Sequence, residues 1–152
     1  MNKVLSFISL LLIIVFCFCG CGKFKLDDYK AGEAIGGNID GSLIKLNSEF
    51  IMFDDGGFLN DDIVRINSDE VDDYEDASDY YNDGTLYYKG IIDEVFCSEN
   101  YLIVTQHNSE KCILIDCSKD TKSASITEVE SIEKVDIDYS DFTKIECSYY
   151  VP

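Results

Sequence analysis

Residues 101–116 are YLIVTQHNSEKCILID, two apolar segments separated by a polar turn. If Asn108-Ser109 is the central pair of that turn, the two segments form a hairpin in which Val104 lies opposite Ile113. Ile103 then falls on the other face of the same hairpin, which is therefore apolar on both sides. This pattern predicts an antiparallel hairpin near the centre of a β-sheet that is covered on each face.

Further segments of strand character lie on the N-terminal side of this hairpin, at residues 43–46, 50–53, 63–66 and 85–97. The first two are separated by Asn47-Ser48-Glu49, which predicts a second hairpin, and the last is predicted to precede the central hairpin as one long strand. Residues 68–84 hold eight acids and no base, so a long solvated loop is expected there.

The C-terminal part predicts helix. Thr127-Glu128-Val129-Glu130 fits a capping box, and apolar residues continue at helical spacing to Val135. Ser140-Asp141-Phe142 could cap a second short helix, although residues 143–147 could equally alternate in a final strand. The predicted fold class is α+β, an antiparallel and mostly meandering β-sheet with one or two short C-terminal helices packed against it.

The N-terminus has the pattern of an export signal. Lys3 is followed by an uncharged run, Val4 to Gly22, that contains LLIIVF and ends in FCGCG. This ending resembles the lipobox of bacterial lipoproteins, although Phe18 stands where such signals usually have leucine. The resemblance implies that Gly20 precedes the cleavage site and that Cys21 becomes the lipidated N-terminus. The alternative is an uncleaved transmembrane anchor, since 19 uncharged residues are nearly enough to span a bilayer.

We therefore expect a signal peptide at 1–20, a lipidated N-terminus and tether at 21–38, and a single globular α+β domain at 39–152. Under either interpretation of the N-terminus, the domain lies on the extracytoplasmic face of the cell membrane. In the first case the partner that holds it is the membrane itself, through the lipid anchor.

The chain is strongly acidic, with 12 Lys and Arg against 30 Asp and Glu and a formal net charge of −18. Cleavage before Cys21 removes one lysine and no acid, which makes the charge −19. Such a charge excludes nucleic acid as an expected partner, because phosphate backbones need lysines and arginines to displace counterions. A basic protein partner is compatible with it, and so is acidity that only keeps a surface domain soluble.

Four cysteines follow Cys21, at Cys97, Cys112, Cys117 and Cys147. An even number in an exported domain favours two disulfides. Cys112 and Cys117 are five apart in one strand and point to opposite faces, so they should not pair with each other. Two pairings stay open, 97–112 with 117–147 and 97–117 with 112–147. The alternative is four buried, reduced thiols.

Other chemistry has little support. His107 lies in the predicted turn, where an exposed histidine is expected. Residues 79–84, DYYNDG, match an EF-hand loop in part but have Tyr81 at its third place and Gly90 at its twelfth. Residues 54–57, DDGG, offer carboxylates without a recognised spacing. We expect no catalytic residue, no metal and no cofactor.

Beyond the signal, the chain resembles small uncharacterised lipoproteins of Gram-positive bacteria from about Gly90 to Asp120. The matching residues are Ile92 and Val95, the strand YLIV at 101–104 and the strand CILID at 112–116. The resemblance implies a cell-surface lipoprotein and a short helix before the tail that ends at Pro152. The expected function is a non-enzymatic binding or interaction module. The alternative is a thiol- or disulfide-dependent enzyme or redox protein of the cell envelope.

Overall fold

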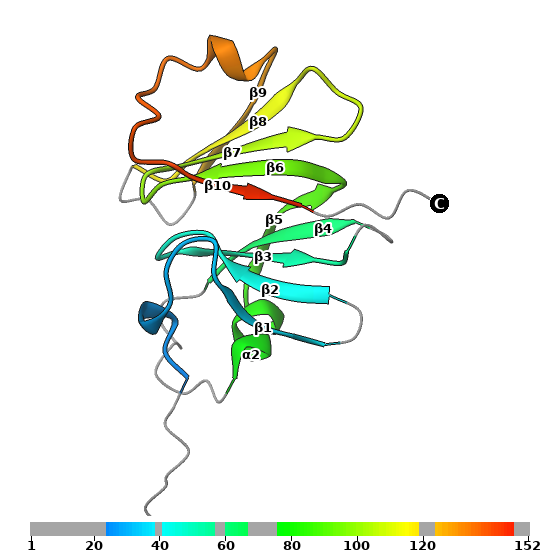
Figure 1. Cartoon of the computed structure of the whole chain (residues 1–152), viewed down its shortest axis with the longest axis vertical. Helices are drawn as coiled ribbons and strands as arrows, with labels where there is room; N and C mark the ends of the chain where they lie inside the picture. The colour runs from blue at the N-terminus through cyan, green and yellow to red at the C-terminus, as the bar shows by residue number, and fades with distance from the viewer. Residues whose placement is uncertain (1–23, 39–40, 57–59, 67–75, 119–123, 148–152) are drawn as a thin grey trace, which may run out of the picture.

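The structure is a computed structural model that describes residues 24–38, 41–56, 60–66, 76–118 and 124–147 (Figure 1). These residues form two five-stranded antiparallel sheets. The first sheet has the order β1 (Ala34–Asn38), β2 (Gly41–Lys45), β3 (Phe50–Asp54), β4 (Asp61–Arg65) and β5 (Thr85–Gly90). The second has the order β10 (Thr143–Glu146), β6 (Ile92–Cys97), β7 (Tyr101–Gln106), β8 (Cys112–Asp116) and β9 (Ser125–Val129).

Both predicted hairpins are confirmed. In β7 and β8, Val104 pairs with Ile113, the register expected from a turn centred on Asn108-Ser109. Asn108 has a positive φ of 56°, a conformation that asparagine tolerates in turns. β7 lies in the middle of the second sheet, and Ile103 and Val104 on its two faces are both fully buried.

The first hairpin is held by its turn. The side-chain Oδ1 of Asn47 accepts hydrogen bonds from the backbone N–H groups of Glu49 and Phe50, each at 2.9 Å. Its Nδ2 donates to the carbonyl of Ser98, at 3.0 Å, in the turn between β6 and β7. Asn47 therefore joins a turn of the first sheet to a turn of the second.

The single strand predicted at 85–97 is wrong. The chain forms β5 in the first sheet up to Gly90, passes exposed Ile91, and enters the second sheet as β6. A Cβ atom at Gly90 would lie 2.5 Å from the hydroxyl oxygen of Tyr88, so a larger residue is not accommodated at this corner without a shift. Only residues 92–97 pair with β7, as the first strand of the expected meander.

The predicted C-terminal helices are also wrong, and the described fold is mostly β. Residues 125–129 form β9, which pairs with β8, and the helical spacing after it becomes a single 3-10 turn, η3 (Ile132–Lys134). Residues 143–146 form the strand alternative, β10, beside β6. Val135 still packs on Ile103. The apolar spacing therefore predicted the buried residue correctly, but the helix that it predicted is absent from this segment.

Two polar regions contain structure that the sequence did not predict. The six-residue helix α2 (Ala77–Asn82) lies within the predicted loop at 68–84, and it begins with a capping box between Asp76 and Asp79. Residues 67–75 of that loop lie outside the described residues. The expected tether at 21–38 contains the 3-10 turn η1 (Leu26–Asp28) and β1, so from Phe24 onward it belongs to the folded domain.

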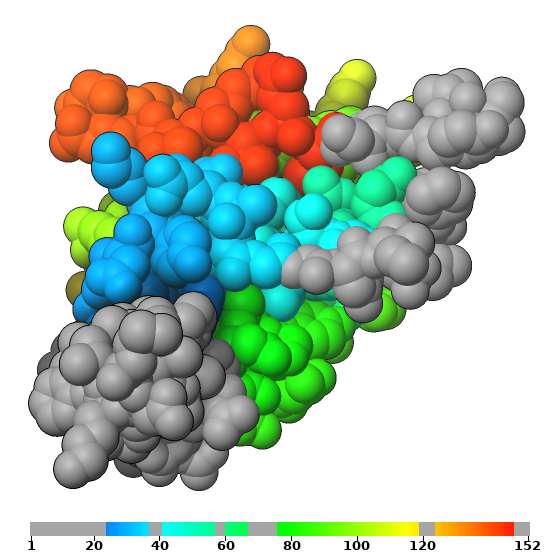
Figure 2. Space-filling model, turned by 60° about the horizontal axis from the view of Figure 1, so that its bottom comes forward, coloured from blue at the N-terminus to red at the C-terminus, as the bar shows by residue number. Residues whose placement is uncertain are grey.

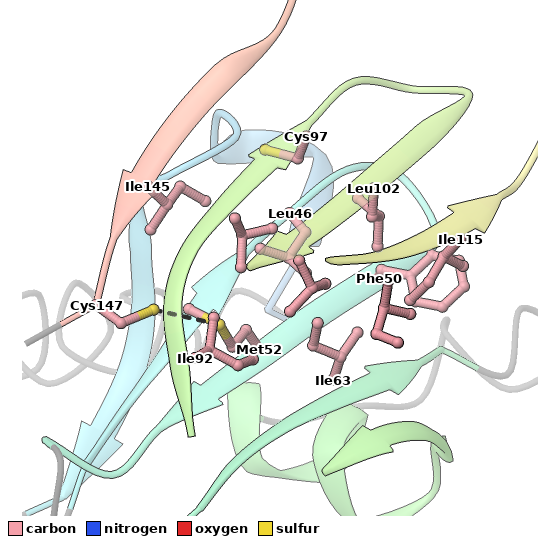
Figure 3. Packing of buried hydrophobic residues seen from close by; sticks show 13 residues of the cluster. Leu46, Phe50, Met52, Ile63, Ile92, Cys97, Leu102, Ile115, Ile145 and Cys147 are labelled. Carbon is pink, nitrogen blue, oxygen red and sulfur yellow. Dashed lines mark hydrogen bonds between the residues drawn. The ribbon is translucent and has the colours of Figure 1, made fainter. Parts of the chain in front are cut away.

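The sheets pack face to face around the main core, which includes Phe50, Met52, Ile92 and Leu102 (Figure 3). The outer face of the first sheet is covered by η1 and α2, and that of the second by the segment 130–142. The domain is thus a stack of four layers, with η1 and α2 at one end of its long axis and β9 with η3 at the other (Figure 1).

Candidate functional site

The N-terminal segment that follows the predicted lipidation site is packed onto the domain. The Phe24 ring stacks on Tyr29, with centroids 5.3 Å apart, and meets the edge of Tyr80 in α2 at 5.4 Å. Leu26 is buried in the cluster on the outer face of the first sheet. Figure 2 shows this blue segment beside the green residues that include α2. The chain therefore enters the fold at a defined place beside α2.

Lys45 of β2 holds this segment through hydrogen bonds to its backbone. It is buried, and its Nζ donates to the carbonyl oxygens of Leu26, at 3.0 Å, and Tyr29, at 2.8 Å. Leu26 begins η1 and its carbonyl also accepts a hydrogen bond from the N–H of Tyr29, at 3.1 Å, while Tyr29 follows the last residue of η1. A cation on β2 thus binds the first folded turn of the chain to the first sheet.

Gly20 and Cys21, the predicted cleavage and lipidation residues, lie outside the described residues. Among the described residues, no helix combines the length and the apolar character needed to span a bilayer.

The four cysteines are free thiols, and the second sheet separates Cys112 from the others. Figure 3 shows Cys97 and Cys147 beside the main core. Cys112 belongs to the cluster on the outer face of the second sheet, whereas Cys97, Cys117 and Cys147 border the core between the sheets. Both predicted pairings require Cys112 to reach one of the other three through the sheet, so neither fits this fold.

Cys97 and Cys117, which share a face of the sheet, are also too far apart to pair. Cys97 in β6 and Cys117 beyond β8 are separated by β7, which places their Cα atoms at least about 9 Å apart across two strand spacings. A disulfide requires roughly 7 Å or less. Cysteine number alone could not reveal this, because it carries no information about which face of the sheet each thiol occupies.

Burial also makes these thiols poor nucleophiles. It raises the pKa of Cys97 and of Cys147 to about 12 and that of Cys117 to about 11, and it raises the pKa of Cys112 as well. Because the thiolate is the reactive form, none of the four has the lowered pKa of a catalytic cysteine.

We expect all four thiols to resist Ellman's reagent in the native mature protein at pH 8 and to react in denaturant. In the lipidated protein the sulfur of Cys21 is alkylated, so denaturation should release four reactive thiols per chain. Prior treatment with reductant is the control and should leave that number unchanged. A count that rises only after reduction would show disulfides and contradict the structure.

Three carboxylates meet where the sheets join. One oxygen each from Asp54, Asp55 and Asp61 lie within 4.8 Å of one another, although the sequence offered only DDGG as a candidate. Asp61 Oδ2 accepts a hydrogen bond from the N–H of Ile92, at 2.9 Å, and Oδ1 accepts one from the N–H of Asp55, at 3.4 Å. Asp61 therefore ties the start of β4 to the start of β6. Residues 79–82, which match an EF-hand loop in part, belong to α2.

Burial raises the pKa of Asp61 to about 6, and the nearby charges of Asp54 and Asp55 add to the effect. The folded state thus binds this proton more tightly than the unfolded chain, whose aspartate pKa is 3.8. The resulting stabilisation is complete below pH 3.8 and is lost as the pH rises through about 6.

Asp61→Asn should therefore gain stability relative to the native protein as the pH is raised from 4 to 8, by about 2 kcal/mol in unfolding free energy. Urea denaturation at successive pH values measures this difference. Exposed Asp136→Asn is the matched control and should leave the pH profile unchanged. Parallel profiles for the native protein and Asp61→Asn would refute the assignment.

An apolar hollow of about 400 Å³ lies on the outer side of the second sheet, where the segment 130–142 crosses it. It is lined by Phe96, Ile132, Glu133, Tyr139, Phe142 and Lys144. The Tyr139 hydroxyl donates to the carbonyl of Ile132, at 3.0 Å, which holds the crossing segment in place. A concave apolar surface with a few polar groups is the usual form of a binding site. Sequence reasoning missed it because only the fold brings Phe96 of β6 beside the segment 132–144.

His107 lies in the predicted turn and is exposed. Its Nδ1 lies 2.9 Å from Asp93 Oδ1, so the histidine has a carboxylate partner at the end of the β6–β7 pair.

Comparisons of the chain with protein-family models, curated proteins and solved structures found no match.

Proposed function

We propose that this chain is a bacterial lipoprotein precursor whose domain is held by a lipid on Cys21 at the extracytoplasmic face of the cell membrane. The observation that carries the proposal is the uncharged run from Val4 to the Gly20-Cys21 pair, with Lys3 before it. The packed segment from Phe24 supports it, because an anchor at Cys21 would join directly to a folded domain.

At the membrane surface the domain acts as a non-enzymatic binding module. The hollow lined by Phe96, Tyr139 and Phe142 supports a binding role. The alternative, a thiol-dependent enzyme, needs an accessible thiolate, and burial with raised pKa values argues against each of the four cysteines of the domain. The net charge of −18 favours a basic protein as the partner and disfavours nucleic acid.

Affinity capture from the native cell envelope tests the binding role. The lipidated protein, immobilised in detergent, should retain a basic protein that is released by raising the salt concentration, since salt screens charge attraction. A matrix that carries another protein of similar acidity is the control and should not retain the same partner. Failure to retain any salt-sensitive partner specifically would count against the proposal.

A further inference from the structure

The link between the proposed anchor and the fold is short. Two residues, Gly22 and Lys23, stand between Cys21 and Phe24. Three residue steps span at most about 10 Å, whatever the conformation of the chain. Phe24 itself contacts Tyr29 and Tyr80, so the chain is packed on the domain from this residue onward.

The position of this entry point on the domain is fixed. Leu26 is buried, and the two hydrogen bonds from Lys45 hold the carbonyls of Leu26 and Tyr29. Phe24, two residues before Leu26, packs against Tyr80 of α2 beside these contacts. The chain thus leaves the domain at the end of the stack formed by η1 and α2 (Figures 1 and 2).

The length of the link, compared with the thickness of the headgroup layer and the diameter of the domain, decides which face of the domain meets the membrane. The headgroup layer on each side of a bilayer is about 5–8 Å thick, comparable with the link. A domain of this size is roughly 35 Å across, more than three times the reach of the link. A link of about 10 Å cannot pass around the domain to bring its opposite end to the bilayer.

We infer that the face formed by η1 and α2 lies against the lipid headgroups and that the bilayer is its binding partner. This inference rests on the proposed lipidation of Cys21. The half-buried rings of Phe24, Tyr29 and Tyr81 gather on this face, and aromatic rings of this kind are favoured at membrane interfaces.

The local charge is compatible with contact to lipid. Lys25 and Lys30 balance Asp27 and Asp28, so residues 24–30 are neutral, whereas α2 and its caps carry Asp76, Asp79 and Asp83 and no base. The charge therefore favours lipid contact on the η1 side of this face. The exposed lysines can meet lipid phosphates at the point where the chain enters the fold.

The orientation also decides which surface faces outward. The segment 130–142 crosses the outer side of the second sheet and lines the hollow, and η3 within it lies at the other end of the stack from α2 (Figure 1). This end is thus held about one domain diameter from the bilayer, where a partner from outside the cell meets it first.

Fluorescence quenching on the lipidated protein tests this orientation. The protein is inserted in vesicles of phosphatidylcholine and phosphatidylglycerol that contain lipids with a nitroxide on the headgroup. A fluorophore is attached through Asp28→Cys on η1 or Glu133→Cys on η3, both exposed positions, in a Cys117→Ser background, because Cys117 is half-buried whereas the other three native thiols of the domain are buried. The probe at position 28 should be quenched several times more strongly than the probe at position 133.

A spacer provides the control. A Gly/Ser insert of about 20 residues between Lys23 and Phe24 has a mean reach of about 25 Å and should abolish most of the difference between the two probes. Co-flotation with equal quenching at both positions in the native-length protein would overturn the orientation and leave the anchor intact. If the protein purified from native membranes carries no lipid and does not float with the vesicles, the anchor and the orientation are both overturned.

Discussion

Cys21→Ala should abolish the incorporation of radioactive palmitate and leave the precursor uncleaved, with residues 1–20 still attached. This result is expected because the thiol of Cys21 is the proposed attachment site for the diacylglyceryl group, and cleavage follows that modification. The loss should be complete, since alanine provides no sulfur to alkylate. Metabolic labelling followed by gel electrophoresis measures both effects, the missing label and the larger chain.

Cys19→Ala is the matched control for this experiment. It removes a neighbouring thiol from the same segment, and Cys21 with Gly20 before it is left unchanged. This variant should keep the label and the mature size. Loss of the label from Cys19→Ala and not from Cys21→Ala would move the anchor to Cys19, and full labelling of both variants would refute a lipid at either residue.

Phe50→Ala should lower the free energy of unfolding by about 3–5 kcal/mol, the cost of deleting a fully buried aromatic side chain. Phe50 lies between the two sheets with no exposed surface, and its ring meets that of Tyr87 edge-on at 5.1 Å. A domain of this size has a total stability of only about 5–15 kcal/mol, so the variant should be close to unfolding. Urea denaturation followed by tyrosine fluorescence measures the effect, since the chain has no tryptophan.

Ile126→Thr is the control for this core substitution. Ile126 is 50% exposed on the edge strand β9, and threonine keeps the branched side chain that suits a strand. We expect a change within about 0.5 kcal/mol. If Phe50→Ala were as mild as Ile126→Thr, the face-to-face packing of the sheets would be wrong.

The parts of the fold that the sequence predicted well are those where neighbouring residues carry the information. The β7–β8 register follows from the turn at Asn108-Ser109 and the alternation on either side of it. The apolar character of both hairpin faces predicted a strand covered on each side, and Ile103 and Val104 confirm it.

The errors arose where tertiary packing overrode a local pattern. The spacing of Val129, Ile132 and Val135 suits a helix. Residues 125–129 instead pair with β8 as a strand. Ile132 and Val135 reach the same buried cluster through the 3-10 turn η3. Helix α2 was missed because its apolar residues, Ala77 and Tyr80, stand within a run of acids. The capping pair Asp76 and Asp79 was the available signal.

The candidate sites differ in how far sequence could reveal them. The anchor at Cys21 is predicted from a contiguous stretch of sequence, so no structure is needed to propose it. The hollow and the carboxylate cluster bring together residues that are separated in the sequence, such as Phe96 with Phe142 and Asp55 with Asp61, and no local pattern links them. The two disulfide pairings left open by the sequence depend on the same kind of information, since the sheet places Cys97 and Cys147, like Cys117, on the face opposite Cys112.

Mass spectrometry of the protein extracted from native membranes tests the central claim most directly. We predict that the N-terminal peptide begins at Cys21 and carries the mass of a diacylglyceryl group, with an added acyl chain on the amino group if the cell attaches one. Treatment with lipase should reduce that mass and leave the peptide sequence unchanged. An N-terminal peptide that retains residues 1–20 and carries no lipid on Cys21 would contradict the account.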